Sequence, residues 1–435
     1  MSQSYSKLVI YGIALTMMLT FSSQDRVMAQ DAATSDTEPG DTGELNNDIV
    51  DESDVNDDDT ADIDTESTVD TISEDDQSRF QFRGDFRPLY TRNERDRRDE
   101  TTTSNSQGQF RLRLKGTALL REGIQVGTRL AWRCESDDCG MDWIAERAIP
   151  GNNGLEAGQA TFDELYAHFF RQEKFNVTVG RQQTRFVLRG GVFARSLDRN
   201  DSNNTNVTWT DGFHATLRNL KGRNWETHLI MQKNSADGSG SIRRDLLDFS
   251  SSAARQTYFI ATENTNQWGP VVQRALDISY LPDSLLVDGT DTGRRENYLA
   301  IVGRLAMRWP LGSGGAALRA GMELGYAPET PTSAAVDIDA DVDGLAWNVA
   351  VSLVGFRPRH NIGVNYGQTG AGWLLSPNFR ENEELFEIRY QWRPANFPAI
   401  DVRLRLREDI EQLTSVLTKQ RVVDAFIRLT WQVSR

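Results

Sequence analysis

The sequence predicts an all-β protein: a transmembrane antiparallel β-barrel of about 16 strands, preceded by a disordered N-terminal tail. Three observations lead to this prediction. Apolar and cationic side chains alternate every second residue, short and long connections between the predicted strands alternate along the chain, and no apolar stretch is long enough for a spanning helix.

The first residues have the composition of a secretory signal. Lys7 precedes the apolar run Val9–Phe21, and the small-residue end of Val27-Met28-Ala29 forms a cleavage site, so we expect a signal peptide over residues 1–29. Neither this run nor any later one reaches the roughly 20 apolar residues that a spanning helix needs. A membrane protein made of this chain must therefore cross the bilayer as a closed barrel.

Residues 30–78 form a strongly acidic tail. Asp31–Ser78 contains 19 Asp or Glu, no Lys or Arg and no aromatic residue, so we expect it to be disordered and periplasmic. Its Asp-rich run lacks the loop glycine and terminal Glu of an EF-hand, and we expect no metal and no cofactor. The formal charge is −15, to which the tail contributes −19 and residues 1–29 contribute +1, so residues 79–435 carry +3.

The stretch Gln109–Arg133 sets the pattern of the predicted barrel, residues 79–435. Phe110, Leu112 and Leu114 share one face of a strand, and cationic residues occupy the other face. Similar segments are predicted at residues 80–90, 109–119, 124–133, 161–170, 175–182, 207–218, 225–233, 255–263, 271–281, 297–309, 317–326, 345–355, 361–366, 385–392, 400–407 and 422–433. The alternating short and long connections are typical of periplasmic turns and outer loops, which places both chain ends on the periplasmic side.

The two cysteines, Cys134 and Cys139, lie five residues apart in a predicted loop. In the oxidising cell envelope we expect a local disulfide between them. The four histidines are scattered along the sequence, which gives no reason to expect a metal site.

Basic residues gather on the predicted inward faces of the first three and the last three strands. Because the first and last strands pair in a closed barrel, these residues should form one arc of the wall. The predicted arc consists of Arg83, Arg87, Arg111, Arg113, Lys115, Arg129, Arg133, Arg389, Arg403, Arg405, Arg407 and Arg428, with few acids among them, chiefly Asp85, Glu387 and Asp401. Such an arc would favour anions over cations in a narrow passage. Alternatively, the arginines only hydrate the lumen and pair with acids of the loops.

The segment Phe175–Gln182 ends in Gly180-Arg181-Gln182 and is followed by a long loop and then by WTDGFHATL, Trp209–Leu217. This arrangement resembles Gram-negative porins, and it is also similar to the alginate-export family. The porin resemblance implies that the third outer loop, Gln183–Asn206, folds into the barrel and narrows it, with Gly190-Gly191 permitting the bend. Its charged residues would be Arg185, Arg189, Arg195, Asp198, Arg199 and Asp201.

These features favour a porin that forms a water-filled channel for the passive diffusion of small, anionic solutes. The alternative is an export or uptake channel for an acidic polysaccharide, and an adhesive role for the loops also remains open. An enzyme is not expected, because the sequence contains no GxSxG and no HExxH motif. The expected partners are outer-membrane lipid and small anionic solutes or a polyanion, with a homotrimer left open and no nucleic acid.

Overall fold

The computed structural model describes residues 79–144, 155, 157–171, 174–182, 186–193, 210–218, 224–234, 255–286, 295–312, 315–330, 342–373, 375, 379, 381–395, 397–414 and 416–434. The predicted signal peptide and acidic tail lie outside these residues, so both stay predictions. Among the described residues, no helix is both long and apolar enough to cross a membrane.

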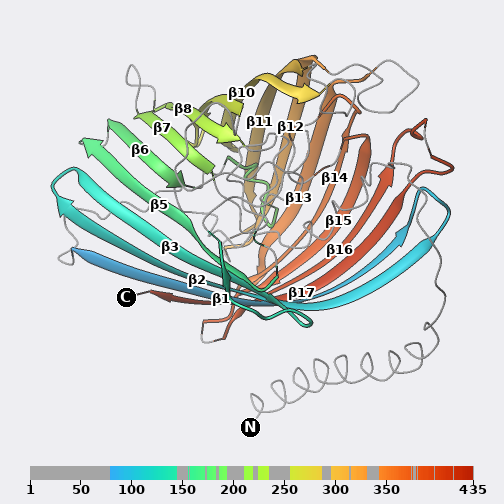
Figure 1. The fold of residues 1–435 in the computed structure, drawn as a ribbon, viewed down its shortest axis with the longest axis horizontal. Coiled ribbons are helices and arrows are strands. Elements are labelled where there is room, and N and C mark those ends of the chain that lie inside the picture. The colour runs from blue at the N-terminus through green and yellow to red at the C-terminus, as the bar shows by residue number, and fades with distance from the viewer. Residues whose placement is uncertain are drawn as a thin grey trace, which may run out of the picture. The chain divides into compact units, whose positions relative to one another are not determined.

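The described chain forms one closed antiparallel barrel of 16 strands, which confirms the predicted fold (Figure 1). Neighbours in sequence pair along the whole wall, and β1 closes the barrel by pairing with β17. A further two-residue strand, β4, pairs in parallel with β5 beside the wall. The strands are β1 (Phe80–Asp96), β2 (Thr102–Arg121), β3 (Ile124–Glu135), β4 (Asp142–Trp143), β5 (Gln159–Arg171), β6 (Phe175–Gln182), β7 (Thr210–Arg218), β8 (Glu226–Asn234), β9 (Arg255–Asn264), β10 (Val271–Leu286), β11 (Arg295–Pro310), β12 (Ala317–Glu329), β13 (Leu345–Arg357), β14 (His360–Thr369), β15 (Glu383–Trp392), β16 (Ala399–Asp409) and β17 (Arg421–Ser434).

The two faces of the wall differ as the alternation predicts. Along β16, Val402 and Leu404 point outward and are exposed, whereas Arg403 and Arg405 point inward and are buried. Other strands repeat this, and the outer surface carries exposed Leu276, Met322 and Ile427 among many apolar side chains. An apolar outer wall around a polar interior is the arrangement of a transmembrane β-barrel.

The two ends of the barrel differ in their connections. We call the end with the β2–β3, β5–β6 and β13–β14 connections the short-turn end, and the opposite end the loop end. At the short-turn end, Gly123 has a φ of 76°, and a Cβ there would lie 2.8 Å from the carbonyl oxygen of Phe170. Glycine is therefore required where this turn closes against β5.

The first connection at the loop end is shorter than the sequence predicts. Residues 91–108 were expected to form a long loop, but β1 and β2 continue as a hairpin to the pair Asp96–Thr102. Beyond the apolar belt both faces of a hairpin meet water, so its residues lose the alternation by which strands are recognised. In the turn, the hydroxyl and the amide of Thr101 donate to Asp99, which lowers the pKa of that carboxyl from its ordinary value.

Candidate pore and its charged wall

The barrel interior has a charged side, formed by β15–β17 and β1–β5. The register places Arg87, Arg111 and Arg133 next to one another across β1, β2 and β3. On the other side of the β1–β17 seam, Arg389 faces Arg403, and Asp401 faces Arg428. The predicted basic residues of both chain ends thus lie on one arc of the inner wall, because the first and last strands pair.

Most of this arc is buried. Arg113, Arg389, Arg403, Arg405, Arg407 and Arg428 are at most 2% exposed, and Arg87, Arg111, Lys115 and Arg133 are also buried. Arg129 is partly buried, with 14% of its side chain exposed. Arg83 differs from the others, because it lies near the start of β1 at the short-turn end and is exposed.

The arc contains more acids than the sequence suggested. At least ten of its twelve basic residues form ion pairs with carboxylates of the described residues. The expected acids Asp85, Glu387 and Asp401 are joined by Glu135, Asp163, Glu164, Glu383 and Asp424. The expectation of few acids was therefore wrong: it missed Glu135, Glu383 and Asp424 on strands that carry the arginines, and Asp163 and Glu164 on the neighbouring β5.

Two clusters show how the charges are shared. On β5, Asp163 lies 3.1 Å from Arg113 and 2.8 Å from Arg129. The neighbouring Glu164 pairs with Arg129 at 2.7 Å and with Lys115 at 3.0 Å. Three cations therefore share two carboxylates at this level. Adjacent like charges would otherwise destabilise the strand pairs that carry them.

The second cluster lies on β16 and β17. Asp424 accepts hydrogen bonds from Arg403 at 2.7 Å and from Arg405 at 2.6 Å. The ring of Phe426 lies among three guanidinium groups, whose central carbons are 4.3 Å (Arg403), 5.3 Å (Arg428) and 5.8 Å (Arg389) from its centroid. An aromatic face attracts cations through its quadrupole but carries no net charge. Among the described residues, the arc therefore has more cations than carboxylates paired with them.

Opposite this arc, part of the third predicted loop lies inside the barrel. Residues 186–193 run along the inner wall from β7–β9 to β15. At one end, Phe186 packs against the rings of Phe259 (5.1 Å) and His228 (4.9 Å). At the other end, the ring centroid of Phe193 lies 5.7 Å from the guanidinium carbon of Arg389. We call residues 186–193 the inserted segment.

Hydrogen bonds hold the middle of the inserted segment to the wall. The Gln273 side chain on β10 donates to the carbonyl of Val187 at 2.8 Å and accepts from the amide of Arg189 at 2.8 Å. On β13, the Ser352 hydroxyl donates to the carbonyl of Gly190 at 2.8 Å and accepts from the amide of Val192 at 3.1 Å. Between these contacts, Gly191 has a φ of 101°, which other residues rarely adopt.

The predicted constriction residues are only partly described. Arg189 lies in the inserted segment, where its side chain pairs with Glu263 of β9 at 3.2 Å. Arg185, Arg195, Asp198, Arg199 and Asp201 lie outside the described residues. Cys134 and Cys139 form a disulfide at the loop end, where the β3–β5 connection begins.

A second inward contact was missed by the sequence reasoning, which placed residues 367–384 in an ordinary outer loop. Trp373, Leu375 and Phe379 of this connection pack inside the wall of β11–β13, and the hydroxyl of Tyr298 donates to the carbonyl of Gly372 at 2.7 Å. Glycines occupy the inward positions of the wall that the inserted segment and this connection cover. Gly321 lies under Leu188, Gly325 under Trp373 and Gly367 under Phe379. This run of small inward residues is the signal that could have indicated the insertions.

The register also brings together histidines that look scattered in the sequence. His214 Nε2 and His228 Nδ1 lie 3.0 Å apart across β7 and β8, and Thr216 Oγ1 is 3.2 Å from each. On β5, His168 bonds Thr178 of β6 at 2.9 Å. Within the described part of the chain, no group of three or more His, Cys, Asp or Glu side chains could hold a metal ion. The histidine pair instead supports Phe186 of the inserted segment.

The fold is shared with solved porin structures. OprB from Pseudomonas putida matches with a TM-score of 0.50 and 12% identity, over 81% of this chain and 94% of that chain. A BenF-like porin from Pseudomonas fluorescens matches with a TM-score of 0.48 and 13% identity, over 83% and 99%. An anion-selective porin from Comamonas acidovorans matches with a TM-score of 0.46 and 12% identity, over 80% and 98%. No family model and no curated protein matches the sequence. The chain therefore has the fold of bacterial outer-membrane porins.

Proposed function

We propose that the protein is an outer-membrane channel through which small solutes diffuse passively, with a moderate preference for anions. The porin fold and the apolar outer wall support a channel across the outer membrane. The observation that carries the anion preference is the basic arc, whose twelve cations outnumber the eight carboxylates that pair with them among the described residues.

The pairing of the arc limits the size of this preference. A guanidinium bonded to a carboxylate contributes a small field at a distance, because the two charges nearly cancel. The excess cations therefore set the selectivity, and we expect anions to be preferred severalfold rather than cations to be excluded. Permeant anions would be small carboxylates or phosphate, which arginine binds through its planar fork.

The same pairing bears on the alternative of an acidic polysaccharide channel. A polyanion needs a continuous track of available cations along its path. Here carboxylates such as Asp163 and Asp424 already occupy guanidinium groups along the arc, and the inserted segment reaches the arc at Arg389. Both features favour small solutes over a polymer.

Planar-bilayer recording of the purified full-length protein tests this function. With a KCl gradient, we expect a reversal potential that reports a chloride permeability above that of potassium. Phosphate should permeate, whereas oligouronates should neither permeate nor block at similar concentrations. A cation-selective channel would contradict the anion preference, block by oligouronate at low concentration would favour the polysaccharide alternative, and no conductance at all would refute the channel.

A further inference from the structure

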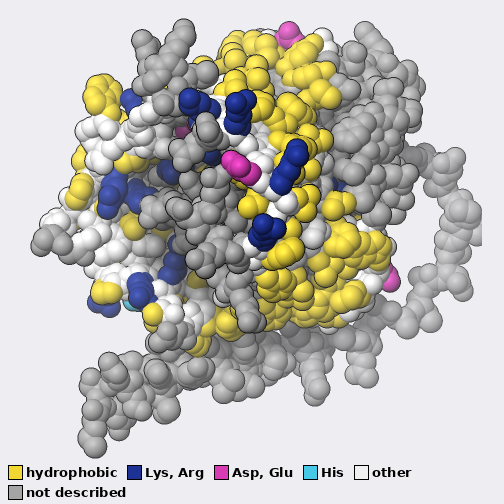
Figure 2. Space-filling view, turned by 90° about the vertical axis from the view of Figure 1, so that its left-hand side faces the viewer, with side chains coloured by type: hydrophobic (Ala, Val, Ile, Leu, Met, Phe, Trp, Pro, Cys, Tyr) yellow, Lys and Arg dark blue, Asp and Glu magenta, His cyan; other side chains and the backbone are white. Residues whose placement is uncertain are grey.

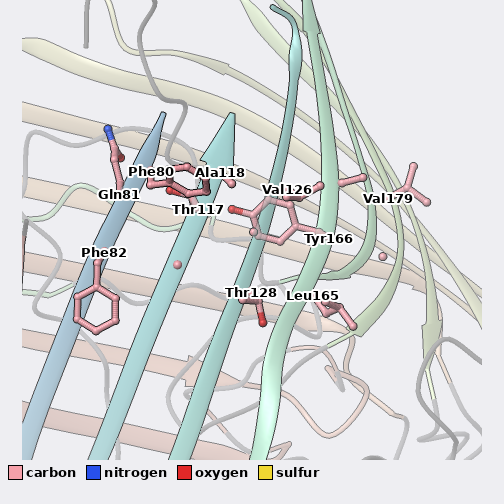
Figure 3. A pocket seen from close by; sticks show the side chains of 14 residues that line it. Phe80, Gln81, Phe82, Thr117, Ala118, Val126, Thr128, Leu165, Tyr166 and Val179 are labelled. Carbon is pink, nitrogen blue, oxygen red and sulfur yellow. The ribbon is translucent and has the colours of Figure 1, made fainter. Parts of the chain in front are cut away.

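The outward face of the wall carries an open apolar groove near the short-turn end (Figure 3). It has a volume of about 1060 Å³ and crosses β1, β2, β3, β5 and β6. Its floor includes the small residues Gly116, Ala118 and Ala167. Larger side chains border it on both sides: Phe80 and Phe82 on β1, and Val179 on β6. Elsewhere the outer wall carries larger exposed side chains, such as Leu276, Met322 and Leu324.

The strand register explains why the groove is continuous. Ala118 pairs with Phe80 on one side and with Val126 on the other, and Val126 pairs with Ala167. These residues form one row across the strands, in which Ala118, Val126 and Ala167 lie between Phe80 and Val179. A row of this kind accepts an extended apolar chain lying across the strands, in van der Waals contact with its floor.

Cations border the groove at the short-turn end. Four exposed cations lie there: Arg79, Arg121, Arg171 and Lys174. Backbone hydrogen bonds place them along one edge, because the amide of Leu119 donates to the Arg79 carbonyl at 2.9 Å and the amide of Lys174 donates to the Arg171 carbonyl at 3.2 Å. In Figure 2, which shows the side bearing the left-hand ends of β1, β2 and β5 in Figure 1, Lys and Arg side chains are common and acids are sparse.

The distance between the cations and the groove suits a lipid. Arg121 follows Ala118 by three residues and Arg171 follows Ala167 by four, which corresponds to about 10–13 Å along a strand. The sequence of these turns also contains Glu122 and Glu173, of which Glu173 lies outside the described residues. In these turns three cations stand against two acids, which leaves an excess of one positive charge beside the apolar groove; Arg79 adds a further cation, but it follows Glu74, Asp75 and Asp76 in sequence.

We propose that this groove and its cationic border bind a phospholipid with an anionic headgroup. An acyl chain lies in the groove over Gly116 and Ala118, and the phosphate and headgroup contact Arg121 and Arg171. Basic residues at the membrane interface attract anionic lipid in this way. A second copy of the chain fits less well, because a contact between like faces would bring two excesses of positive charge together.

Native mass spectrometry of the full-length protein tests the proposal, after incubation with equal amounts of phosphatidylglycerol and phosphatidylethanolamine. We expect wild-type protein to retain phosphatidylglycerol preferentially. Each cation near a membrane surface contributes about 1 kcal/mol, a factor of about five in affinity, so the double variant Arg121→Gln/Arg171→Gln should lose the preference by more than tenfold. The matched control is Arg357→Gln/Arg359→Gln, which removes two exposed cations from the β13–β14 turn and should keep the preference.

A second pair of variants tests the groove itself. A Cβ added at Gly116 meets nothing within 4 Å, and the same holds for Gly303 on β11, away from the groove. Gly116→Leu should fill the groove and lower retention of both lipids severalfold, whereas Gly303→Leu should not. Equal retention of the two lipids by wild-type protein, or unchanged binding in both the charge and the Gly116 variants, would overturn the proposal. Loss of an oligomer in Gly116→Leu with lipid retention unchanged would assign the groove to a second copy and overturn it as well.

Discussion

Asp424 is the carboxylate whose removal should raise anion selectivity most clearly. It is 3% exposed, and it accepts hydrogen bonds from Arg403 and Arg405. Asp424→Asn keeps the shape of the side chain and removes one negative charge from the arc. Both guanidinium groups then act on the lumen with one charge fewer opposing them.

The size of the effect follows from Coulomb's law. One unit charge acts on a permeating ion about 6 Å away in water with about 0.7 kcal/mol, and salt at about 0.1 M reduces this to roughly 0.4 kcal/mol. An anion gains this energy and a cation loses it, so the ratio of their permeabilities should rise roughly fourfold. A reversal potential measured in a KCl gradient reports that ratio directly.

The control is Glu384→Gln. This substitution also removes one negative charge. However, Glu384 lies on the outward face near the loop end, where it accepts a hydrogen bond from the hydroxyl of Tyr366 at 3.0 Å. Its substitution should leave the ratio unchanged. Removing one partner of a buried ion pair costs about 3–5 kcal/mol of stability, so both variants must first show the heat-modifiable gel mobility of a folded barrel. A folded Asp424→Asn protein with the wild-type permeability ratio would refute the idea that the excess charge of the arc sets selectivity.

Further variants test other parts of the structure. Replacing Arg403, Arg405 and Arg407 together by Gln should lower the chloride-to-potassium permeability ratio, and an unchanged ratio would argue against the arc. Ser352→Ala removes the hydroxyl that bonds Gly190 and Val192 and should increase open-channel current noise and conductance, while Ser104→Ala in the exposed β1–β2 hairpin should change neither. Cys134→Ser should leave the barrel folded but destabilise the closed loop by about 2 kcal/mol, measured as faster proteolysis at the loop end; equal cleavage rates would contradict this. Deleting residues 31–78 should leave a heat-modifiable, inserted barrel, and loss of insertion would show that the acidic tail does more than separate the signal from the barrel.

The strands were predictable because each must place apolar residues on one face for lipid. Where lipid ends, this requirement ends too, and the hairpin of β1 and β2 was therefore predicted too short. Its outer residues 91–96 and 102–108 are polar on both faces, so their sequence resembles that of a loop although they continue the hydrogen-bonded ladder.

The positions of the arc's basic residues were predictable from the sequence. The electrostatic field of the arc was not, because it depends on which carboxylates pair with these residues. Parity along a strand determines which residues face inward, and pairing of the first and last strands brings Arg111 and Arg428 to one side of the lumen. Parity does not reveal which carboxylate meets which guanidinium. Asp163 and Glu164 are adjacent in sequence, and both are buried and paired with inward cations, because the register of β3 and β5 shifts between Arg129 and Leu130. An alternation rule cannot anticipate such an irregularity.

The insertions depend on contacts between residues far apart in sequence. Nothing local in the β14–β15 connection distinguishes Trp373 from an exposed loop residue. Its place becomes clear only together with Gly325 of β12, on which the indole lies. A glycine facing inward in one strand and a large apolar residue in a loop some 50 positions later form a pair that the strand pattern alone does not connect.

In the second cluster, the space between three arginines is filled by an aromatic ring rather than by a further carboxylate. At the level of Asp163 and Asp424, carboxylates cancel much of the positive charge. Between Arg389, Arg403 and Arg428 the central residue is Phe426, whose ring stabilises the guanidinium groups without adding negative charge. Each of the three also pairs with a carboxylate, but one of these, Asp424, is shared with Arg405, so the described cations of this cluster exceed its carboxylates by one. The inserted segment reaches the arc at this same level, because Phe193 contacts Arg389. Phe426→Leu should therefore destabilise the cluster but leave the permeability ratio nearly unchanged, whereas Phe426→Glu should lower the ratio severalfold. An equal effect of the two substitutions on selectivity would show that the field is set elsewhere in the barrel.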